Sequence, residues 1–544
     1  MATWLIQGGR ILDGTGAAAF EGDLLLEGDR IAGVLPRGEA SPSADRVLDA
    51  SGCMVSPGFI DMHSHADWTL ALADHEAWMK ITLEQGVTTV VAGNCGFSPA
   101  PVAPGGLGAD EGSLVSLLVE EPLDFTWRTM GEFLDRLERN GLVVNMAELV
   151  GHASLRAAAS ARARGAMPPH QLESCLAEAR RSLDEGACGV SFGLGYDPGM
   201  YSPLEELAAF SRVAAAAGKP VTVHLKALSA ISPTYPVTYL KPHNLRALQE
   251  MLDIARETGV RLQVSHFIFV GRRSWGTAGR ALEMVAKARR EGVDVMIDAF
   301  PYTCGNTTIH APLPYWFLAR GPAGYRSRAA RARLRLELEI GFRLVGFVYD
   351  DFQVMDAAIE GEEELNGSTI AEIARRRRAR PFDTLLDLSE RSRGETLMLF
   401  HSYSGAPGEE GVLEAVLADP HCLFETDALV RRRGHPNPAA AGTFPRILGE
   451  FARERRLFPI EDAIRRMTSA SAERFGIRDR GVLAKGKAAD LVVFDPAAIA
   501  DAPAQQGRPA GRPAGIRHVF LNGSQVVKDS LYQAGSRAGR VLRS

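Results

Sequence analysis

The stretch SPGFIDMHSH, residues 56–65, decides the fold of this 544-residue chain. Its apolar run through Phe59 and Ile60 is typical of a short buried strand, and His63 and His65 follow that strand one residue apart. Alternate side chains of an extended chain point the same way, so two histidines with this spacing grip one cation from the same side. The stretch therefore predicts a metal site at a strand end, and a metal in a cleft usually serves hydrolysis.

Outward from this strand, apolar runs of strand length alternate with helical stretches from residue 57 to about residue 477. The strand candidates are residues 58–62, 88–92, 143–150, 189–193, 220–224, 261–266, 294–299, 397–400 and 422–426. Helical stretches between them include residues 169–185, 204–217, 244–258 and 280–291. Such repeated alternation implies parallel strands, and it predicts an α/β fold of the (β/α)8 TIM-like barrel type rather than an open sheet.

Three further segments interrupt or flank this pattern. Residues 1–56 and 478–544 both consist of short strands and turns, which predicts that the two chain ends join as one small β-sandwich domain. Between about residues 303 and 365 the alternation lapses into Pro-rich, aromatic and Arg-rich sequence. An irregular segment of this length inside a barrel is usually functional, so we expect a lid insertion over the barrel mouth.

Composition excludes several classes of partner. The net charge of -5 arises from 61 basic and 66 acidic residues, so neither nucleic acid nor a membrane surface is expected as a partner. The sequence has no basic-then-apolar leader and no apolar stretch long enough to span a bilayer, which favours a cytoplasmic protein. Six cysteines without paired spacing are expected to be reduced. The sequence leaves both a monomer and a homo-oligomer open.

Candidate metal ligands occur one or two at a time at the ends of the predicted barrel strands. They are His63, His65, Cys95, His224, His266 and Asp427. An isolated histidine is more often structural, and a lone cysteine is more often a small buried hydrophobe. Six such residues at the same end of barrel strands favour a metal site instead, because zinc binds imidazole, thiolate and carboxylate. Asp427 is also suited to cap a helix, but a metal-activated water needs a base, and we assign it that role.

Several motifs resemble the amidohydrolase superfamily, and more narrowly its D-aminoacylase, or N-acyl-D-amino-acid deacylase, branch. They are SPGFIDMHSH (56–65), GVTTVVAGNCG (86–96), YDPG (196–199), GTFPR (442–446), RGVL (480–483) and GKAADLVVFD (486–495). The resemblance covers nearly the whole chain. Its Asn-Cys-Gly element is specific to this branch, because most relatives bridge their metals with a carboxylated lysine.

The resemblance implies a zinc enzyme that hydrolyses the amide of an N-acylated amino acid. It implies that Cys95, His224 and His266 hold the tighter zinc. A second, weaker site would consist of His63 and His65 with Cys95 and Asp427. Zinc would polarise the amide carbonyl and lower the pKa of bound water from ~15.7 toward ~7, while Asp427 passes the proton to the departing amine. The segment after Tyr302 would be the mobile lid.

The chain departs from the family pattern at positions that would hold a substrate carboxylate. Ile268 stands two residues after His266, where the branch typically carries a lysine. Phe300 and Asn306 replace a tyrosine and a serine, and Asn437 replaces an arginine. Exchanging lysine for isoleucine removes a charge-assisted bond and adds apolar surface. These changes predict a larger or less charged, peptide-like amide as substrate, in place of an ordinary N-acyl-D-amino acid.

A nearby cation offers the competing explanation, in which the carboxylate is still bound. Lys226, two residues after His224, and Arg272 or Arg273 are close enough in sequence to compensate. His152 and Tyr196 are further candidates for substrate contact. The sequence is equally consistent with a hydrogen bond from His152 to a ligand residue. It is also equally consistent with Tyr196 belonging to a plain turn.

Two other functions remain open at this point. A cyclic-amide hydrolase of the hydantoinase or dihydroorotase kind would share the fold, but such enzymes usually need the bridging lysine, and Cys95 stands in its place. A catalytically inactive binding protein on the same barrel is the alternative from another class, and the intact set of ligands argues against it.

Overall fold

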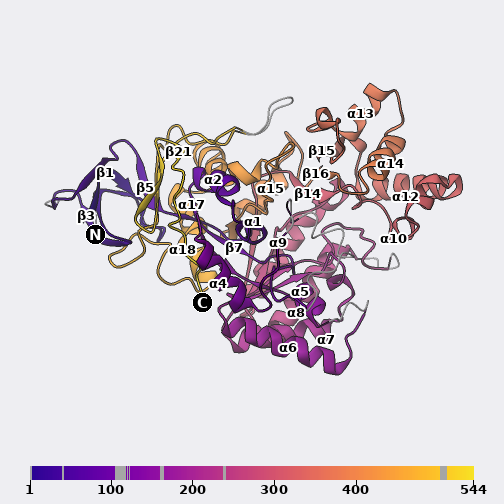
Figure 1. The fold of residues 1–544 in the computed structure, drawn as a ribbon, viewed down its shortest axis with the longest axis horizontal. Helices are drawn as coiled ribbons and strands as arrows, with labels where there is room; N and C mark the ends of the chain where they lie inside the picture. Colours follow the sequence, from indigo (N-terminus) through magenta and orange to yellow (C-terminus); the bar gives the residue numbers. More distant parts are fainter. Residues whose placement is uncertain are drawn as a thin grey trace.

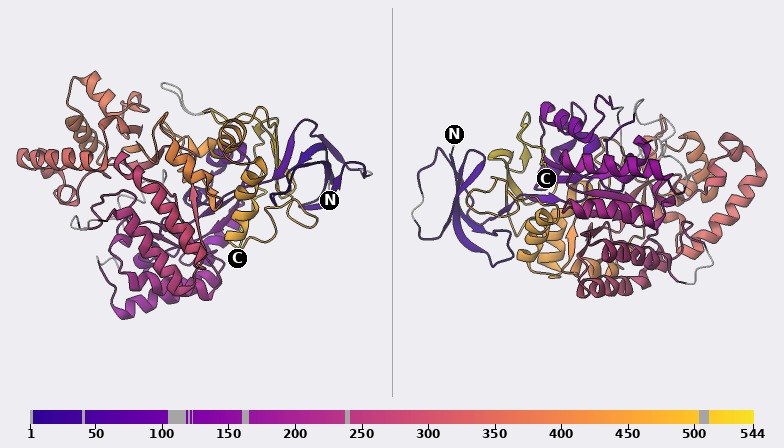
Figure 2. Two further views of the ribbon diagram at one scale, coloured as in Figure 1. Left: turned by 180° about the vertical axis from the view of Figure 1, so that it is seen from behind. Right: turned by 90° about the horizontal axis from the view of Figure 1, so that it is seen from below.

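The computed structural model describes residues 3–39, 42–103, 118, 121, 123–159, 165–236, 241–502 and 511–544. Three parts follow one another along its longest axis (Figure 1). A β-rich part formed by both chain ends lies at one end, the barrel lies in the middle, and a mainly helical part lies at the other end. Two further views give the same order (Figure 2).

The middle part is a barrel of parallel strands. Within the described residues its strands are β6 (Phe59–Asp61), β7 (Val87–Ala92), β8 (Asn145–Glu148) continued by β9 (Val150–Gly151), β10 (Val190–Gly193), β11 (Val221–His224), β12 (Leu262–Val264), β13 (Val295–Ala299) and β17 (Cys422–Phe424). Almost every residue of these strands is buried, as expected for parallel strands covered on both faces. The predicted (β/α)8 barrel is confirmed.

A side chain, rather than a strand ladder, joins the last strand to the first. The Asp61 carboxylate accepts hydrogen bonds from the Thr426 backbone N–H at 3.0 Å and from its hydroxyl at 2.7 Å. One residue on, the Asp427 N–H donates to the His63 carbonyl at 3.0 Å. Burial raises the pKa of Asp61 to about 7, although the bonds from Thr426 oppose that rise. This junction between the first and last barrel strands therefore lies directly beneath His63, His65 and Asp427, three of the predicted ligands.

Helices surround the barrel. They are α1 (Ala66–Leu70), α2 (Glu76–Glu84), α4 (Met130–Asn140), α5 (His152–Ala158), α6 (Pro169–Asp184), α7 (Leu204–Ala216), α8 (His243–Thr258), α9 (Ala278–Arg290), α15 (Gly411–Ala418), α16 (Ala439–Arg446), α17 (Ile460–Met467) and α18 (Ser469–Arg474). The four helices predicted from the sequence are found within two residues of their expected ends. Among the helices described, none combines the length and apolar character needed to cross a bilayer.

The two chain ends form a nine-stranded sheet. Its strands are β1 (Thr3–Ile11), β2 (Phe20–Glu27), β3 (Arg30–Pro36), β4 (Arg46–Asp49), β5 (Met54–Pro57), β18 (Leu491–Phe494), β19 (Ile516–Leu521), β20 (Ser524–Lys528) and β21 (Leu531–Tyr532). The two halves meet where β5 pairs antiparallel with β18. Because β5 leads into β6 after one residue, this sheet is tied directly to the first barrel strand.

An inserted unit separates β13 from β17. It contains β14 (Cys304–Thr308), β15 (Phe352–Asp356), β16 (Leu397–His401), α10 (Tyr315–Leu318), α11 (Pro322–Arg326), α12 (Arg328–Val345), α13 (Ile370–Arg377) and α14 (Pro381–Arg391). Its strands form an antiparallel sheet in the order β14-β16-β15. The unit buries its own apolar core, which includes Phe317, Leu334, Phe352 and Met398.

The position of β16 corrects one sequence expectation. Residues 397–400 were predicted as a barrel strand, but they pair antiparallel with β14 and β15. The inserted unit thus continues past residue 365, where the sequence analysis ends it, to His401. A short apolar run has the same appearance in a parallel barrel and in an antiparallel sheet covered by helices, so periodicity alone does not separate the two.

Candidate metal centre

The six predicted ligands meet at the carboxyl ends of the barrel strands. They form two groups that share Cys95: one with His63, His65 and Asp427, the other with His224 and His266. Within each group the potential ligand atoms all lie within 4.8 Å of one another. The barrel brings them together because each follows or ends one of the strands β6, β7, β11, β12 and β17.

The Cys95 thiol occupies the centre of the cluster. Its Sγ atom lies 3.5 Å from His63 Nε2, 3.5 Å from His266 Nε2 and 3.8 Å from His224 Nδ1. His224 Nδ1 and His266 Nε2 are 2.8 Å apart. One sulfur therefore faces nitrogen atoms of both groups, which is the position of a bridging ligand.

Asp427 completes the group of His63, His65 and Cys95, and it lies on the most exposed side of that group. One of its carboxylate oxygens lies 3.4 Å from His65 Nε2 and 3.5 Å from His63 Nε2. Its side chain is 21% exposed, whereas each of the other five residues is 8% exposed or less. The carboxylate is thus the most accessible of the six predicted ligands.

Three of the six residues adopt a backbone conformation that side chains rarely take. The φ angles of Cys95, His266 and Asp427 are 54°, 31° and 44°, in the left-handed region. Such conformations cost free energy and persist where the surroundings enforce them, often at functional sites. The Cys95 backbone also packs closely on Gly193, where only glycine fits, since a Cβ atom there would lie 1.9 Å from the Cys95 carbonyl oxygen.

Ser191 holds the loop that carries Cys95. Its hydroxyl donates to the Gly93 carbonyl and accepts from the Gly96 N–H at 3.1 Å. These two hydrogen bonds fix the chain on both sides of the cysteine.

Sequence reasoning missed a set of carboxylates beneath the ligands. Asp298 accepts a hydrogen bond from the His266 N–H at 2.6 Å and lies 3.6 Å from His63 Nδ1. Together with Glu425 it forms a third potential ligand group around His63. Asp298 stands inside the predicted strand 294–299 and Glu425 two residues before Asp427, so acidic residues within buried strands were the available signal.

Burial shifts the pKa values of the two histidines and the cysteine that are predicted to hold the tighter metal. Desolvation, reinforced by the charge of His266, lowers the pKa of His224 well below its ordinary value, and burial also lowers the pKa of His266. A lowered pKa favours the neutral imidazole, which is the form that binds a metal. Burial raises the pKa of the Cys95 thiol well above its ordinary value, so a thiolate there needs a cation beside it. A buried set of imidazoles, one thiol and one carboxylate fits a zinc-like ion.

Asp427 behaves differently from the other buried carboxyl groups of the site. Burial works to raise its pKa, but the hydrogen bond to His65 and the charges of His266 and His63 outweigh that effect. Its pKa lies below the ordinary value, and the group is ionised at neutral pH. By contrast, burial and the neighbouring Asp298 and Asp427 raise the pKa of Glu425 well above the ordinary value.

Comparison with known proteins assigns the family. The model of the amidohydrolase family matches residues 46–527, which include the barrel, the six predicted ligands and part of the sheet formed by the chain ends. The chain belongs to the amidohydrolase family. It is a metal-dependent hydrolase of carbon–nitrogen amide bonds.

Similar proteins span the full length of this amidohydrolase. D-aminoacylase from Alcaligenes xylosoxydans xylosoxydans is 31% identical over 99% of this chain and 97% of its own. N-acyl-D-glutamate deacylase from the same organism is 33% identical over 99% of this chain and 96% of its own. The crystal structure of N-acyl-D-glutamate deacylase from Bordetella bronchiseptica, with zinc and a phosphonate inhibitor, superposes with a TM-score of 0.81 at 31% identity, covering both chains completely. L-hydantoinase from Arthrobacter aurescens, at 16% identity and a TM-score of 0.58, shares the fold.

An apolar cluster lies beside the metal ligands of this amidohydrolase. We use this name for Ile268, Phe300, Tyr302, Cys304 and Ala439, which pack together and are all buried. Leu228, Val270 and Tyr403 pack against it. Two of its members, Ile268 and Phe300, are positions at which the sequence departs from the deacylase pattern. Two of the four departures therefore lie in one cluster.

Tyr196 and His152, the two further candidates for substrate contact, differ in where they lie. The Tyr196 ring lies 4.4 Å from the His224 ring, so Tyr196 borders the metal centre. His152 is fully buried, and its Nε2 atom is 2.8 Å from the Glu206 carboxylate, which also pairs with Arg156 at 2.6 Å. The structure thus places His152 in a buried hydrogen-bonded network with α7, with its ring between those of Phe192 and Phe210.

Lys226, Arg272 and Arg273, the cations considered for binding a substrate carboxylate, contact other residues or solvent. The Lys226 ammonium lies 5.4 Å from the centre of the Tyr235 ring, and Lys226 lines a small cavity together with Glu250. Arg272 makes two hydrogen bonds, at 2.7 and 2.9 Å, to Asp351 of the inserted unit. Arg273 is exposed. None of these contacts links Lys226 or Arg272 to the metal ligands.

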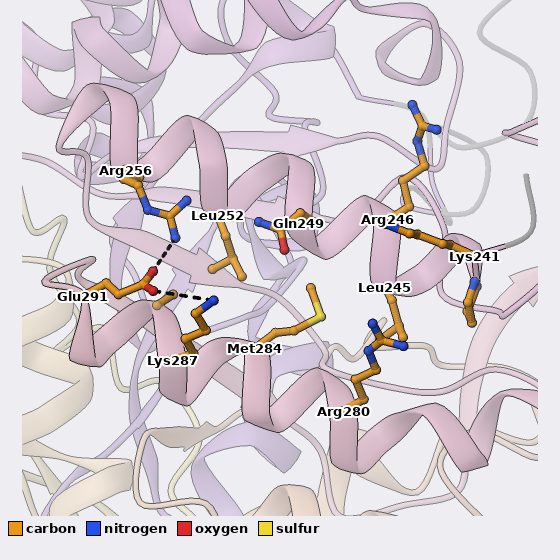
Figure 3. Close-up of a pocket in the computed structure, with 12 residues that line it drawn as sticks. Lys241, Leu245, Arg246, Gln249, Leu252, Arg256, Arg280, Met284, Lys287 and Glu291 are labelled. Atoms are coloured by element: carbon orange, nitrogen blue, oxygen red, sulfur yellow. Dashed lines mark hydrogen bonds and ion pairs between the residues drawn. The ribbon is translucent and has the colours of Figure 1, made fainter.

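A large surface cavity of about 760 Å³ lies apart from the site, between α8 and α9 (Figure 3). Its rim carries Arg256 and Lys287, which both pair with Glu291, while Leu252 and Met284 form part of its floor. None of the candidate ligands lines this cavity. It is a groove between outer helices of the barrel rather than the reaction site.

Proposed function

We propose that this amidohydrolase uses zinc to hydrolyse a small N-acyl amide whose amine side carries no free carboxylate, such as a peptide-like amide. In this proposal Cys95, His224 and His266 hold the tighter zinc. His63 and His65, with Cys95 and Asp427, form a second and weaker site. The similarity to deacylases of N-acylated D-amino acids, one of them crystallised with zinc, supports the metal and the bond that is cleaved.

The observation that carries the proposal is the placement of an ionised carboxylate at the open edge of the ligand cluster. Asp427 lies within 3.5 Å of two imidazoles and is the most exposed of the six residues. Zinc, when bound, supplies electrophilic polarisation of the amide carbonyl and a lowered pKa for water. Asp427 then accepts one proton from the attacking water and delivers it to the nitrogen as the C–N bond breaks, which leaves a carboxylic acid and an amine.

The buried surroundings supply the rest of the chemistry. His63 and His65 flank the Asp427 carboxylate and hold it in one orientation through contacts of 3.5 and 3.4 Å. Tyr196 covers the site on the His224 side. A low-polarity enclosure strengthens every electrostatic interaction with the developing charge.

The apolar cluster supports an uncharged substrate. A carboxylate in a buried cleft requires cationic or hydroxyl donors, and its desolvation is costly without them. At the positions in question the chain offers Ile268 and Phe300, and Lys226 and Arg272 interact with other residues.

Replacement of Asp427 by asparagine tests the catalytic role. We expect Asp427→Asn to lower kcat by about 10²- to 10⁴-fold, the usual contribution of a general acid–base group. Zinc at the tighter site should remain, as measured by elemental analysis of the purified protein. Asp253→Asn, an exposed aspartate on α8 paired with Arg256, is the matched control and should keep wild-type turnover. A variant Asp427→Asn with activity within tenfold of wild type would show that another group is the base.

A further inference from the structure

The side-chain amide of Asn306 connects the inserted unit to the catalytic aspartate. Asn306 lies on β14, and its Nδ2 atom donates a hydrogen bond of 3.0 Å to the Asp427 carbonyl. A carbonyl oxygen only accepts, so this contact fixes the orientation of the amide: Nδ2 faces Asp427 and Oδ1 faces the other way.

The Oδ1 atom of Asn306 is buried and has no hydrogen-bond partner among the described residues. Leaving a buried polar acceptor unpaired costs about 1–3 kcal/mol. Native proteins keep few such groups, and where one borders a reaction site a ligand is a natural partner for it. The atom is thus an unpaired acceptor on the side chain that binds the Asp427 carbonyl.

The strand pattern places this acceptor at the edge of the apolar cluster. Side chains two residues apart on a strand share a face, so Asn306 and Cys304 lie on the same face of β14. Cys304 belongs to the apolar cluster, together with Ile268 and Phe300. Asn306 therefore stands between the Asp427 backbone on one side and apolar side chains on the other.

The charges around this position disfavour an anion. Arg446 is a cation that contacts the apolar cluster, since its guanidinium lies 4.8 Å from the centre of the Tyr302 ring. That guanidinium is already surrounded by three carboxylates, Glu450 at 3.0 Å, Asp501 at 3.5 Å and Glu410 at 3.6 Å. A substrate carboxylate that faces the Oδ1 atom of Asn306 would meet an acceptor rather than a donor.

We propose that Oδ1 of Asn306 accepts a hydrogen bond from an N–H group on the amine side of the substrate. The substrate then carries a carboxamide or a further peptide bond where a carboxylate would otherwise stand. This inference rests on the proposed function and names the group that the site recognises. Asn306 is a specificity-determining residue in this assignment, in addition to its contact with the Asp427 backbone.

A comparison of substrate analogues separates recognition from positioning. The series is an N-acetyl amino acid amide, its N,N-dimethylamide, its methyl ester and its free acid, assayed with the wild type and with Asn306→Ala. In the wild type we expect kcat/KM for the primary amide to exceed that for the dimethylamide and the ester by about 3- to 10-fold, the worth of one neutral hydrogen bond. The free acid should be the poorest substrate.

In Asn306→Ala the preference for the N–H donor should disappear. If Asn306 only positioned Asp427, all four substrates would lose the same factor and the ratios would stay unchanged. Asn306→Ser, which keeps a short polar side chain, guards against a folding defect, and thermal melts of both variants verify folding. Thr307→Ala is the matched control, because that side chain lies on the opposite face of β14 and its substitution should leave the ratios intact.

Three outcomes overturn the inference, and the first two are distinguishable from the third. N–H recognition is contradicted if the wild type hydrolyses the free acid best. It is equally contradicted if the substrate ratios of Asn306→Ala match those of the wild type. In both cases amide hydrolysis by the metal centre still stands. No turnover of any of these amides by zinc-loaded enzyme contradicts the proposed function itself, and this inference with it. Inhibition constants of the corresponding amine products give the same comparison without turnover.

Discussion

The metal ligands and the apolar cluster occupy neighbouring positions on the same strand ends, yet they differ in how they relate to the deacylase pattern. His266 and Ile268 are two residues apart: the first lies 3.5 Å from the Cys95 thiol, and the second is buried among Phe300 and Cys304. Every expected ligand is present, whereas the residues expected to bind a carboxylate are replaced. We therefore expect reaction chemistry and substrate choice to depend on separate side chains, so that one can change while the other is kept.

The largest effect is expected from replacing Cys95, the residue that both ligand groups share. We expect Cys95→Ala to lose bound zinc and about a thousandfold or more of the activity, because the metal contributes several kcal/mol to the transition state. His65→Ala affects only the second group, so it should retain the tighter zinc and a larger share of the activity. Elemental analysis and kcat/KM for each variant provide the measurement.

Metal removal from the unmodified protein gives the control for this prediction. Dialysis against a chelator should abolish turnover, and one equivalent of zinc should restore most of it. If Cys95→Ala bound zinc as tightly as the wild type, the bridging position of the thiol would have no part in holding the metal.

An intermediate effect is expected from restoring a cation to the apolar cluster. Ile268→Lys should raise kcat/KM for a free N-acyl amino acid relative to its amide by about 10- to 100-fold, the range for a hydrogen bond to a charged group of about 1.5–3 kcal/mol. Burial of the ammonium group should also lower the stability of the folded protein, as seen in a thermal melt. Ile268→Met, which preserves volume and apolar character, is the control and should leave the ratio unchanged. An unaltered ratio in the lysine variant would place the carboxylate-binding position elsewhere.

The smallest effect tests whether a nearby cation compensates. Lys226→Met should change kcat/KM by less than about twofold for both the acid and the amide, since the Lys226 ammonium faces Tyr235 and Glu250 rather than the ligands. A selective rise in KM for the free acid would show that Lys226 does bind the carboxylate.

Much of the fold could be predicted because buried parallel strands leave a clear trace in the sequence. The apolar runs ending at His224 and Ala299 are such strands, and the ligands follow their ends in the order expected of a barrel. The inserted unit was harder to delimit, since β16 is an apolar run like those of the barrel and its antiparallel pairing depends on partners distant in the chain.

The site was predictable at the level of residue types and less so at the level of contacts. Motif and strand position predicted the six residues that the structure brings together, but the contact between Asn306 and Asp427 joins residues that only the tertiary fold brings together. The same holds for His152, whose partner Glu206 lies on a different helix. Lys226 and Arg272 looked suitable because sequence distance does not show where a long side chain points.

The pairing of β5 with β18 has a consequence for how the molecule is made. Pro57 lies opposite Leu491, so the sheet of the chain ends is completed only after the barrel and the inserted unit between them have been synthesised. Until then β5 presents an unpaired edge, although it leads directly into the strand that carries His63. The free edge of β5 therefore gains its final partner only after every strand that precedes a candidate ligand has been made.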